Sequence, residues 1–163
     1  MVYLVGVDHQ VQHNGQPMTP KREEATRAFY TFLELKAKDL NISMFAEEFN
    51  DDALRNSCAS AATVRDLAHR LGLKHRFCEP TRQERKELGI SKDRDRREQF
   101  WLSCLEPHLN SETILFVCGA DHLESFQNKL LGKGVKAKIL PEQYGIGLAP
   151  LVITEQYGNF LDL

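Results

Sequence analysis

The sequence has few cysteines and no pair of them in a recognisable motif. Its four cysteines are Cys58, Cys78, Cys104 and Cys118, and no two show the C-x-x-C spacing of a zinc or redox motif. The cysteine spacing therefore indicates neither a disulfide framework nor a zinc ribbon. We expect scattered, buried thiols in a reducing compartment.

Net charge of one sign and long apolar runs are also lacking. A formal charge of −2 at pH 7 gives no general attraction to nucleic acid or to a membrane surface. The stretch from Arg82 to Arg97 interleaves basic and acidic residues, so we expect a solvated helical pair that does not bind nucleic acid. The apolar opening Val2–Val7 turns polar at Asp8, too early for a signal peptide or a membrane span. We expect a cytoplasmic protein with no membrane partner.

Three familiar catalytic signatures are missing as well. There is no G-x-S-x-G motif, which argues against a serine hydrolase. Gly145-Ile146-Gly147 lacks the following helix that would make it a phosphate-binding loop. His9 and His13 have the spacing of H-E-x-x-H, but Gln10 stands in place of the glutamate and the segment follows a strand. A zincin-type peptidase is therefore not expected.

Short apolar runs alternate with longer stretches of helical periodicity. Strands are predicted at Val2–Val7, Ile42–Ala46, Lys74–Cys78, Thr113–Cys118 and Val135–Leu140, with an edge strand at Leu151–Thr154. Helices are predicted from Pro20 to Leu40, from Asp51 to Leu71 in two pieces around Ser57–Ser60, and over Thr81–Leu88, Asp93–Leu109 and Asp121–Leu131. This alternation predicts an α/β fold, a single domain over residues 1–163 with a mostly parallel sheet and helices on both faces.

One four-residue pattern occurs at the ends of two predicted strands. Both Gly6-Val7-Asp8-His9 and Gly119-Ala120-Asp121-His122 read G-x-D-H. Carboxyl ends of parallel strands meet at one edge, where ligands bind and where glycine lets the backbone turn. Glu47, at the end of the second strand, brings a carboxylate to that edge. Two histidines and one carboxylate leave coordination positions open, so His9, His122 and Glu47 are predicted to bind a catalytic metal ion.

Several alternatives stay open at this point. Each motif histidine could simply cap the turn that follows it and bind nothing. Adjacent strand residues face opposite sides, so either Glu47 or Glu48 is the site carboxylate; Glu47 is favoured because it directly follows the apolar run. Asp8 and Asp121 are expected to cap or support the next element, and His13 to face solvent.

Taken together, these motifs resemble the TraB/TIKI group and its erythromycin-esterase and ChaN-like relatives. The resemblance rests on Tyr3–His9, Met44–Phe49, Arg97–Trp101 and Ile114–His122, short islands within residues 2–140. Some members of the group are similar to metal-dependent peptidases and others to esterases, while ChaN-like members are associated with haem. The resemblance therefore implies a fold and a site more firmly than a reaction.

The resulting hypothesis is a divalent-metal-dependent hydrolase of an ester or peptide bond, acting on a small-molecule or peptide substrate. In it, Glu48 or a nearby carboxylate is the base, and Arg97 holds a substrate carboxylate or a developing oxyanion. The alternative is a non-catalytic domain that binds a small ligand or haem in the same crevice, and a third is an interaction domain. The substrate, the metal and whether the chain forms a homo-oligomer do not follow from the sequence.

Overall fold

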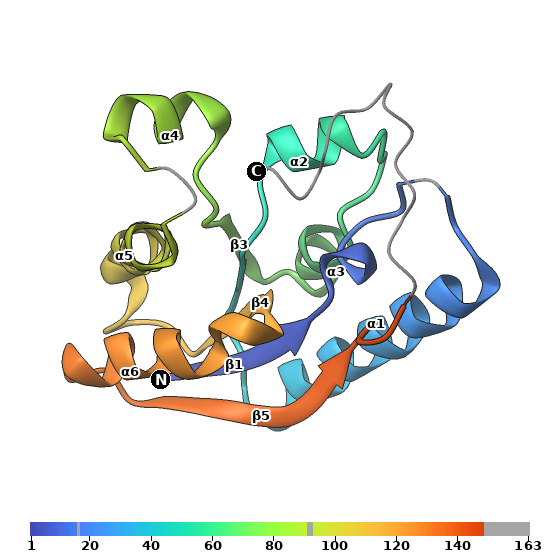
Figure 1. Cartoon of the computed structure of the whole chain (residues 1–163). Helices are drawn as coiled ribbons and strands as arrows, with labels where there is room; N and C mark the ends of the chain where they lie inside the picture. Colours follow the sequence, from blue (N-terminus) through green and yellow to red (C-terminus); the bar gives the residue numbers. More distant parts are fainter. Residues whose placement is uncertain (16, 91–92, 149–163) are drawn as a thin grey trace.

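The computed structural model describes residues 1–15, 17–90 and 93–148. Its strands form one sheet in the order β3-β2-β4-β1-β5, and each neighbouring pair is parallel (Figure 1). The strands are Val2–Val7 (β1), Met44–Glu47 (β2), Lys74–Phe77 (β3), Ile114–Gly119 (β4) and Ala137–Tyr144 (β5). The α/β class and the parallel sheet are therefore as the sequence predicts.

Helices connect the strands throughout. The α-helices are Pro20–Asp39 (α1), Asp51–Asn56 (α2), Thr63–Leu71 (α3), Arg82–Leu88 (α4), Arg94–Leu105 (α5) and Leu123–Gly132 (α6). Short 3₁₀ turns lie at His9–Val11 (η1), Glu106–His108 (η2) and Ala120–His122 (η3). Among the described helices, none is both long and apolar enough to cross a bilayer.

The two faces of the sheet are covered by different helices (Figure 1). Alternate strand residues point to opposite faces, so Val5 and Val7 of β1 pack with α1 and α3, while Val2 and Leu4 pack with α5 and α6. Apolar burial on both faces explains why the strands read as continuous apolar runs. The same alternation decides which of two adjacent glutamates reaches which helix layer.

Some element boundaries differ from the prediction, each for a local reason. β5 continues past Pro141 to Tyr144, and its register with β1 shifts between Leu4 and Gly6. A strand at the end of the sheet order with such a bulge tolerates a residue that has no N–H. The helix predicted to reach Leu109 ends at Leu105, where a 3₁₀ turn containing Pro107 begins. The predicted strand 151–154 lies outside the described residues.

Candidate functional site

Three strands deliver polar residues to one edge of the sheet. β1 leads into η1, which begins at His9, and β4 leads into η3, which ends at His122. β2 ends at Glu47 and is followed by Glu48. Because β4 pairs with both β1 and β2, the three strand ends are neighbours.

Glu48 lies at the centre of this group. Its side chain is buried, and its Oε1 is 3.6 Å from Nε2 of His9 and 3.7 Å from Nε2 of His122. The backbone N–H of Gly119 donates to Oε2 at 2.8 Å, and Arg97 forms an ion pair with Oε1. The two imidazole nitrogens cannot be farther apart than these two distances combined. The structure thus brings His9 and His122 together around one carboxylate.

The Glu48 carboxyl is ionised at neutral pH. Burial alone would raise its pKa, but the positive charges of His9, Arg97 and His122 and the N–H of Gly119 outweigh that effect and hold the pKa below its usual value. A buried, ionised carboxylate therefore lies at the carboxyl edge of the sheet.

The His9 ring is oriented by a chain of hydrogen bonds that reaches the opposite face of the sheet. Nδ1 of His9 is 2.6 Å from Oε1 of Gln12, and Nε2 of Gln12 donates to Oε2 of Glu47 at 2.7 Å. A carboxylate only accepts, so the Gln12 amide must turn its NH₂ to Glu47 and its oxygen to His9. We infer that Nδ1 of His9 carries a proton and donates to Gln12, while Nε2 faces Glu48.

His122 is oriented in the same way from the other face. Its Nδ1 is 2.8 Å from Oε1 of Glu98, and this buried carboxylate also accepts from Ser125 at 2.6 Å. The indole ring of Trp101 packs edge-on against the imidazole, with 4.8 Å between ring centroids. Nε2 of His122 therefore faces Glu48 as well.

Gly119 leaves a space among these three side chains. A Cβ at this position would lie 3.4 Å from Oε2 of Glu48, 3.4 Å from Nε2 of His9 and 3.6 Å from Cδ2 of His122. Its φ of −55° suits any residue, so the glycine is not needed for a turn here. The absent side chain instead keeps open the space that the site residues face.

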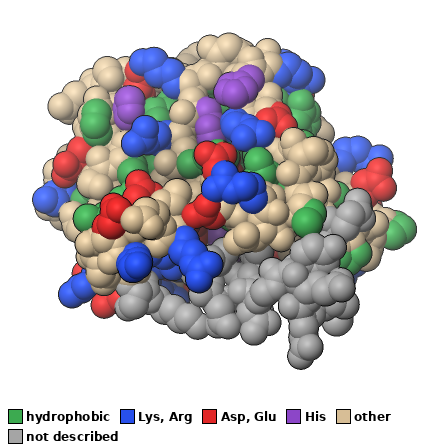
Figure 2. Space-filling model, turned by 90° about the horizontal axis from the view of Figure 1, so that it is seen from above, with side chains coloured by type: hydrophobic (Ala, Val, Ile, Leu, Met, Phe, Trp, Pro, Cys, Tyr) green, Lys and Arg blue, Asp and Glu red, His purple; other side chains and the backbone are tan. Residues whose placement is uncertain are grey.

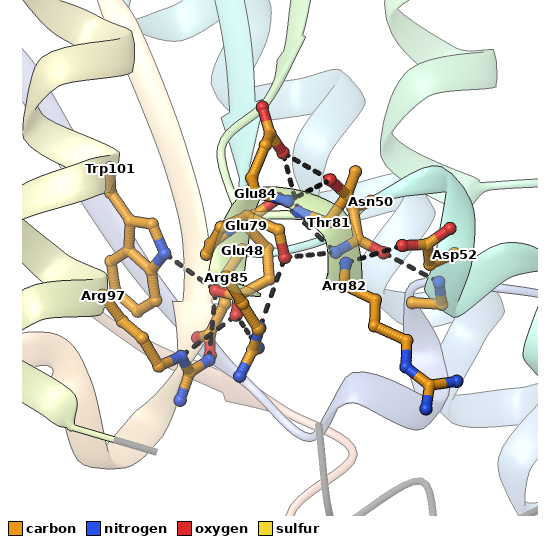
Figure 3. Close-up of polar contacts among 12 residues, drawn as sticks. Glu48, Asn50, Asp52, Glu79, Thr81, Arg82, Glu84, Arg85, Arg97 and Trp101 are labelled. Atoms are coloured by element: carbon orange, nitrogen blue, oxygen red, sulfur yellow. Dashed lines mark hydrogen bonds and ion pairs between the residues drawn. The ribbon is translucent and has the colours of Figure 1, made fainter. Parts of the chain in front are cut away.

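Arg97 lies between two buried carboxylates (Figure 3). Its Nη2 pairs with Glu48, and its Nε and Nη2 donate to Glu79 at 3.0 and 3.1 Å. Glu79 also accepts from the indole N–H of Trp101 at 2.8 Å and pairs with Arg85. Burial would lower the pKa of Arg97, but Glu48 and Glu79 raise it overall. Since both carboxylates engage the guanidinium, Arg97 positions Glu48 in this structure. Its predicted contact with a substrate carboxylate or a developing oxyanion stays a prediction.

Glu47 does not face the histidine pair, which corrects the choice made from the sequence. Its carboxylate is fully buried on the α3 side of the sheet, where it contacts Gln12 and lies 2.8 Å from Nε2 of His75. The reason is the two-residue alternation of β2: Glu48 shares a face with Ala46 and points to α5. Glu48 therefore takes the position predicted for Glu47. Glu47 is linked to His9 through the hydrogen bonds of Gln12 instead.

Other site residues were missed or misplaced from the sequence. His13 is buried against Phe49 and Arg22, not exposed as expected. Gln12 follows His9 by one 3₁₀ turn, and Glu98 directly follows Arg97, so their spacing was an available signal. His75 had none, because only the sheet pairing brings it to Glu47. Asp8 caps η1 through the N–H of Gln10, as anticipated.

The spacing of the three donor atoms bears on a metal ion. Within the part of the chain that the structure describes, no group of three or more His, Cys, Asp or Glu side chains is arranged so that it could hold a metal ion. The Nε2–Oε1 separations of 3.6 and 3.7 Å exceed a hydrogen bond. Two imidazoles and one carboxylate are donors of the kind that zinc binds, and a metal ion at this place stays a prediction.

Comparison with known protein families, curated proteins and solved structures finds no match to this chain. The resemblance to the TraB/TIKI group therefore stays a prediction, and the geometry of the site has to carry the functional argument alone.

Proposed function

We propose that the chain is a hydrolase of ester or amide bonds whose site consists of His9, Glu48 and His122, and that it works with a divalent cation. The observation that supports this most is the matched orientation of the two histidines. In each ring the Nδ1–H donates a hydrogen bond to an acceptor outside the site, and Nε2 faces the same Glu48 oxygen. Metal-ligating histidines are held in this way by a partner for the second ring nitrogen.

A divalent cation at this place would polarise a carbonyl group and lower the pKa of water. The protein's own residues prepare for that chemistry. Gln12 and Glu98 fix the two rings so that Nε2 of each, the nitrogen that would bind the cation, faces the site. Gly119 and Arg97 fix the Glu48 carboxylate and keep it ionised. His9, whose side chain is 38% exposed, opens the site to a substrate from solvent.

One observation favours a second function, binding of a small ligand without turnover. Arg97 already balances the charge of Glu48 in the structure, so the pocket is electrostatically satisfied without an added cation. The two imidazoles could then bind a ligand, such as haem, that is not transformed.

Metal titration of point variants tests the proposal. Chelator-treated protein is titrated with Zn²⁺, Mn²⁺ and Co²⁺ by calorimetry and is then assayed on p-nitrophenyl esters and fluorogenic peptides. We expect one equivalent of ion to bind to the unaltered chain and both His9→Ala and His122→Ala to lose it. Glu48→Gln should weaken affinity for the ion more than Glu47→Gln does. Glu47 reaches His9 through Gln12, so its replacement should weaken affinity for the ion about 10-fold. His69→Ala, on the exposed surface of α3, is the matched control.

Gly119→Ala tests the space itself. The added methyl meets its neighbours at ordinary contact distance, so the fold should persist while ion binding and hydrolysis fall at least about 10-fold. Gly132→Ala, where a Cβ would have no neighbour within 4 Å, should leave both unchanged. Ion binding that survives loss of both histidines contradicts the site. Ion or haem binding without hydrolysis of any substrate supports the second function.

A further inference from the structure

Two cysteines that are distant in sequence meet on the α5 side of the sheet. Cys78 directly follows β3 and is fully buried, while Cys104 lies on α5 and is partly exposed. Both belong to the apolar cluster around Trp101, and the two thiols interact closely enough that each shifts the pKa of the other. The expectation of scattered thiols is therefore wrong for this pair.

The backbone segments that carry the two thiols are held together independently of the sulfur contact. Glu79, the residue after Cys78, accepts from the indole N–H of Trp101 at 2.8 Å. Trp101 precedes Cys104 by one turn of the same helix, and Arg97 on that helix also binds Glu79 (Figure 3). The contacts of Glu79 with α5 thus hold the segment that follows β3 close to the helix that carries Cys104.

The two thiols differ in a way that assigns their roles. The neighbouring Cys78 thiol is the main cause that lowers the pKa of Cys104 to about 7. Arg76 also lowers this pKa, whereas burial raises it. Burial raises the pKa of Cys78. Cys104 is therefore partly thiolate at neutral pH and accessible, whereas Cys78 stays protonated and shielded.

We propose that Cys78 and Cys104 form a reversible intramolecular disulfide when the folded protein meets hydrogen peroxide. The Cys104 thiolate attacks one peroxide oxygen, the O–O bond breaks, and the leaving hydroxide takes up a proton as water. The Cys78 thiol then attacks the sulfenic sulfur of Cys104; the S–S bond forms and the hydroxyl leaves as a second water with the Cys78 proton. Two thiols are oxidised by two electrons and one peroxide is reduced.

The bond would link the end of β3 covalently to α5. That helix carries Arg97 and Glu98, which contact Glu48 and His122 respectively. Oxidation would therefore restrain the positions of these two residues, although the proposal does not depend on whether the site hydrolyses or binds.

Peptide mapping tests the pair directly. A Cys58→Ser background removes the exposed thiol and leaves three cysteines. The folded protein is treated with hydrogen peroxide, blocked with N-ethylmaleimide and digested without reduction. We expect a peptide that links Cys78 to Cys104, loss of two of the three free thiols, and full recovery with dithiothreitol. Cys118, which is buried, should remain a free thiol in the folded protein and serves as the internal control.

Single variants separate a specific pair from general oxidation. Cys104→Ser should leave Cys78 unoxidised. Cys78→Ala removes both the partner thiol and the main cause of the lowered pKa of Cys104, so Cys104 should oxidise more slowly and, without a disulfide to form, proceed to sulfinic acid. Circular dichroism checks the fold of each variant, and the linked peptide in the Cys58→Ser background decides the matter even if Cys78→Ala fails to fold. Sulfinic acid at Cys104 beside a free Cys78 thiol, or cross-links only between chains, overturns the proposal.

Discussion

The two adjacent glutamates show that a shift of one position along a strand changes which residues a side chain contacts. Glu47 and Glu48 are both buried carboxylates, yet they face opposite helix layers and contact different histidines. The sequence placed a carboxylate at the correct strand end, because an apolar run followed by charge marks that end. It could not choose between the two, because the alternation fixes relative orientation but not which face carries the site.

His13 makes the stability of the fold depend on pH in a defined window. Burial, followed by the charges of Arg22 and His9, lowers its pKa to about 4, from an unfolded value of about 6.5. Between these values the unfolded chain binds the extra proton, so stability falls as the pH drops from about 6.5 to 4 and is independent of this residue above 6.5. The shift corresponds to a loss on the order of 3 kcal/mol.

Urea unfolding followed by circular dichroism at pH 7 and pH 4.5 measures this loss. Nδ1 of His13 accepts from the N–H of Gly15 at 3.0 Å, and the amide oxygen of an asparagine, bonded to Cγ as Nδ1 is, can replace that contact without titrating. We expect His13→Asn to lose about 2 kcal/mol less than the unaltered chain over this interval. His69→Asn, on the exposed surface, should behave as the unaltered chain does. Equal losses in all three proteins would contradict the assignment.

At the scale of elements, the two G-x-D-H segments use glycine for different purposes. Neither glycine adopts a positive φ, so neither serves the turn that the sequence suggested. Gly119 leaves space for the site, whereas Gly6 lets β1 approach η3: a Cβ there would be 2.8 Å from Cδ1 of Leu123 and 3.1 Å from Cα of Ala120. The repeated motif was thus a sound guide to position and a poor guide to the role of its glycine.

Gly6→Ala should therefore displace η3 and the histidine that it carries. Contact with the backbone of Ala120 cannot be relieved by a rotamer change, so we expect a loss of about 1–3 kcal/mol in the free energy of unfolding. Ion binding at the site should weaken as well, because His122 belongs to η3. Denaturant unfolding and calorimetry measure the two effects, with Gly132→Ala as the control. Unchanged stability would show that η3 moves freely relative to β1.

Elements were predictable where a local cause determines them and not where pairing does. Thr19 caps α1 with Pro20 at its first position, and the helical region 51–71 divides into α2 and α3 as expected. The continuation of β5 beyond Pro141 was not predictable, because it depends on a bulge opposite β1. The contact of Glu47 with His75 likewise arises only when β3 pairs with β2.

For the whole molecule, the all-parallel sheet explains why one edge collects the site. The α3 side supplies the chain from His75 to His9, and the α5 side supplies Glu98 and Arg97, so both helix layers hold the same pair of histidines. Seen from above, acidic, basic and histidine side chains are interspersed on this face (Figure 2). Arg85 and Arg97 are paired with carboxylates. That the stretch from Arg82 to Arg97 does not bind nucleic acid stays a prediction.

Hydrogen exchange should rank the strands by their place in the sheet. β1 and β4 each have a hydrogen-bonded strand on both sides, and their side chains are almost entirely buried. β3 stands at one end of the strand order and alternates between exposed and partly buried residues. Opening β1 or β4 exposes both apolar clusters and amounts to global unfolding, whereas β3 can separate from β2 locally.

We therefore expect amides of 2–7 and 114–119 to exchange most slowly, at rates set by global unfolding, and those of 74–77 at least about 10-fold faster. Mass spectrometry of peptic fragments, on reduced protein at neutral pH, measures the three segments in one experiment. The oxidised Cys78–Cys104 form supplies a comparison, since a link at the end of β3 should slow exchange in 74–77 and leave β1 and β4 unchanged. Protection of β3 equal to that of β4 in the reduced protein would mean that the sheet opens as one unit, and the local separation of β3 would be wrong.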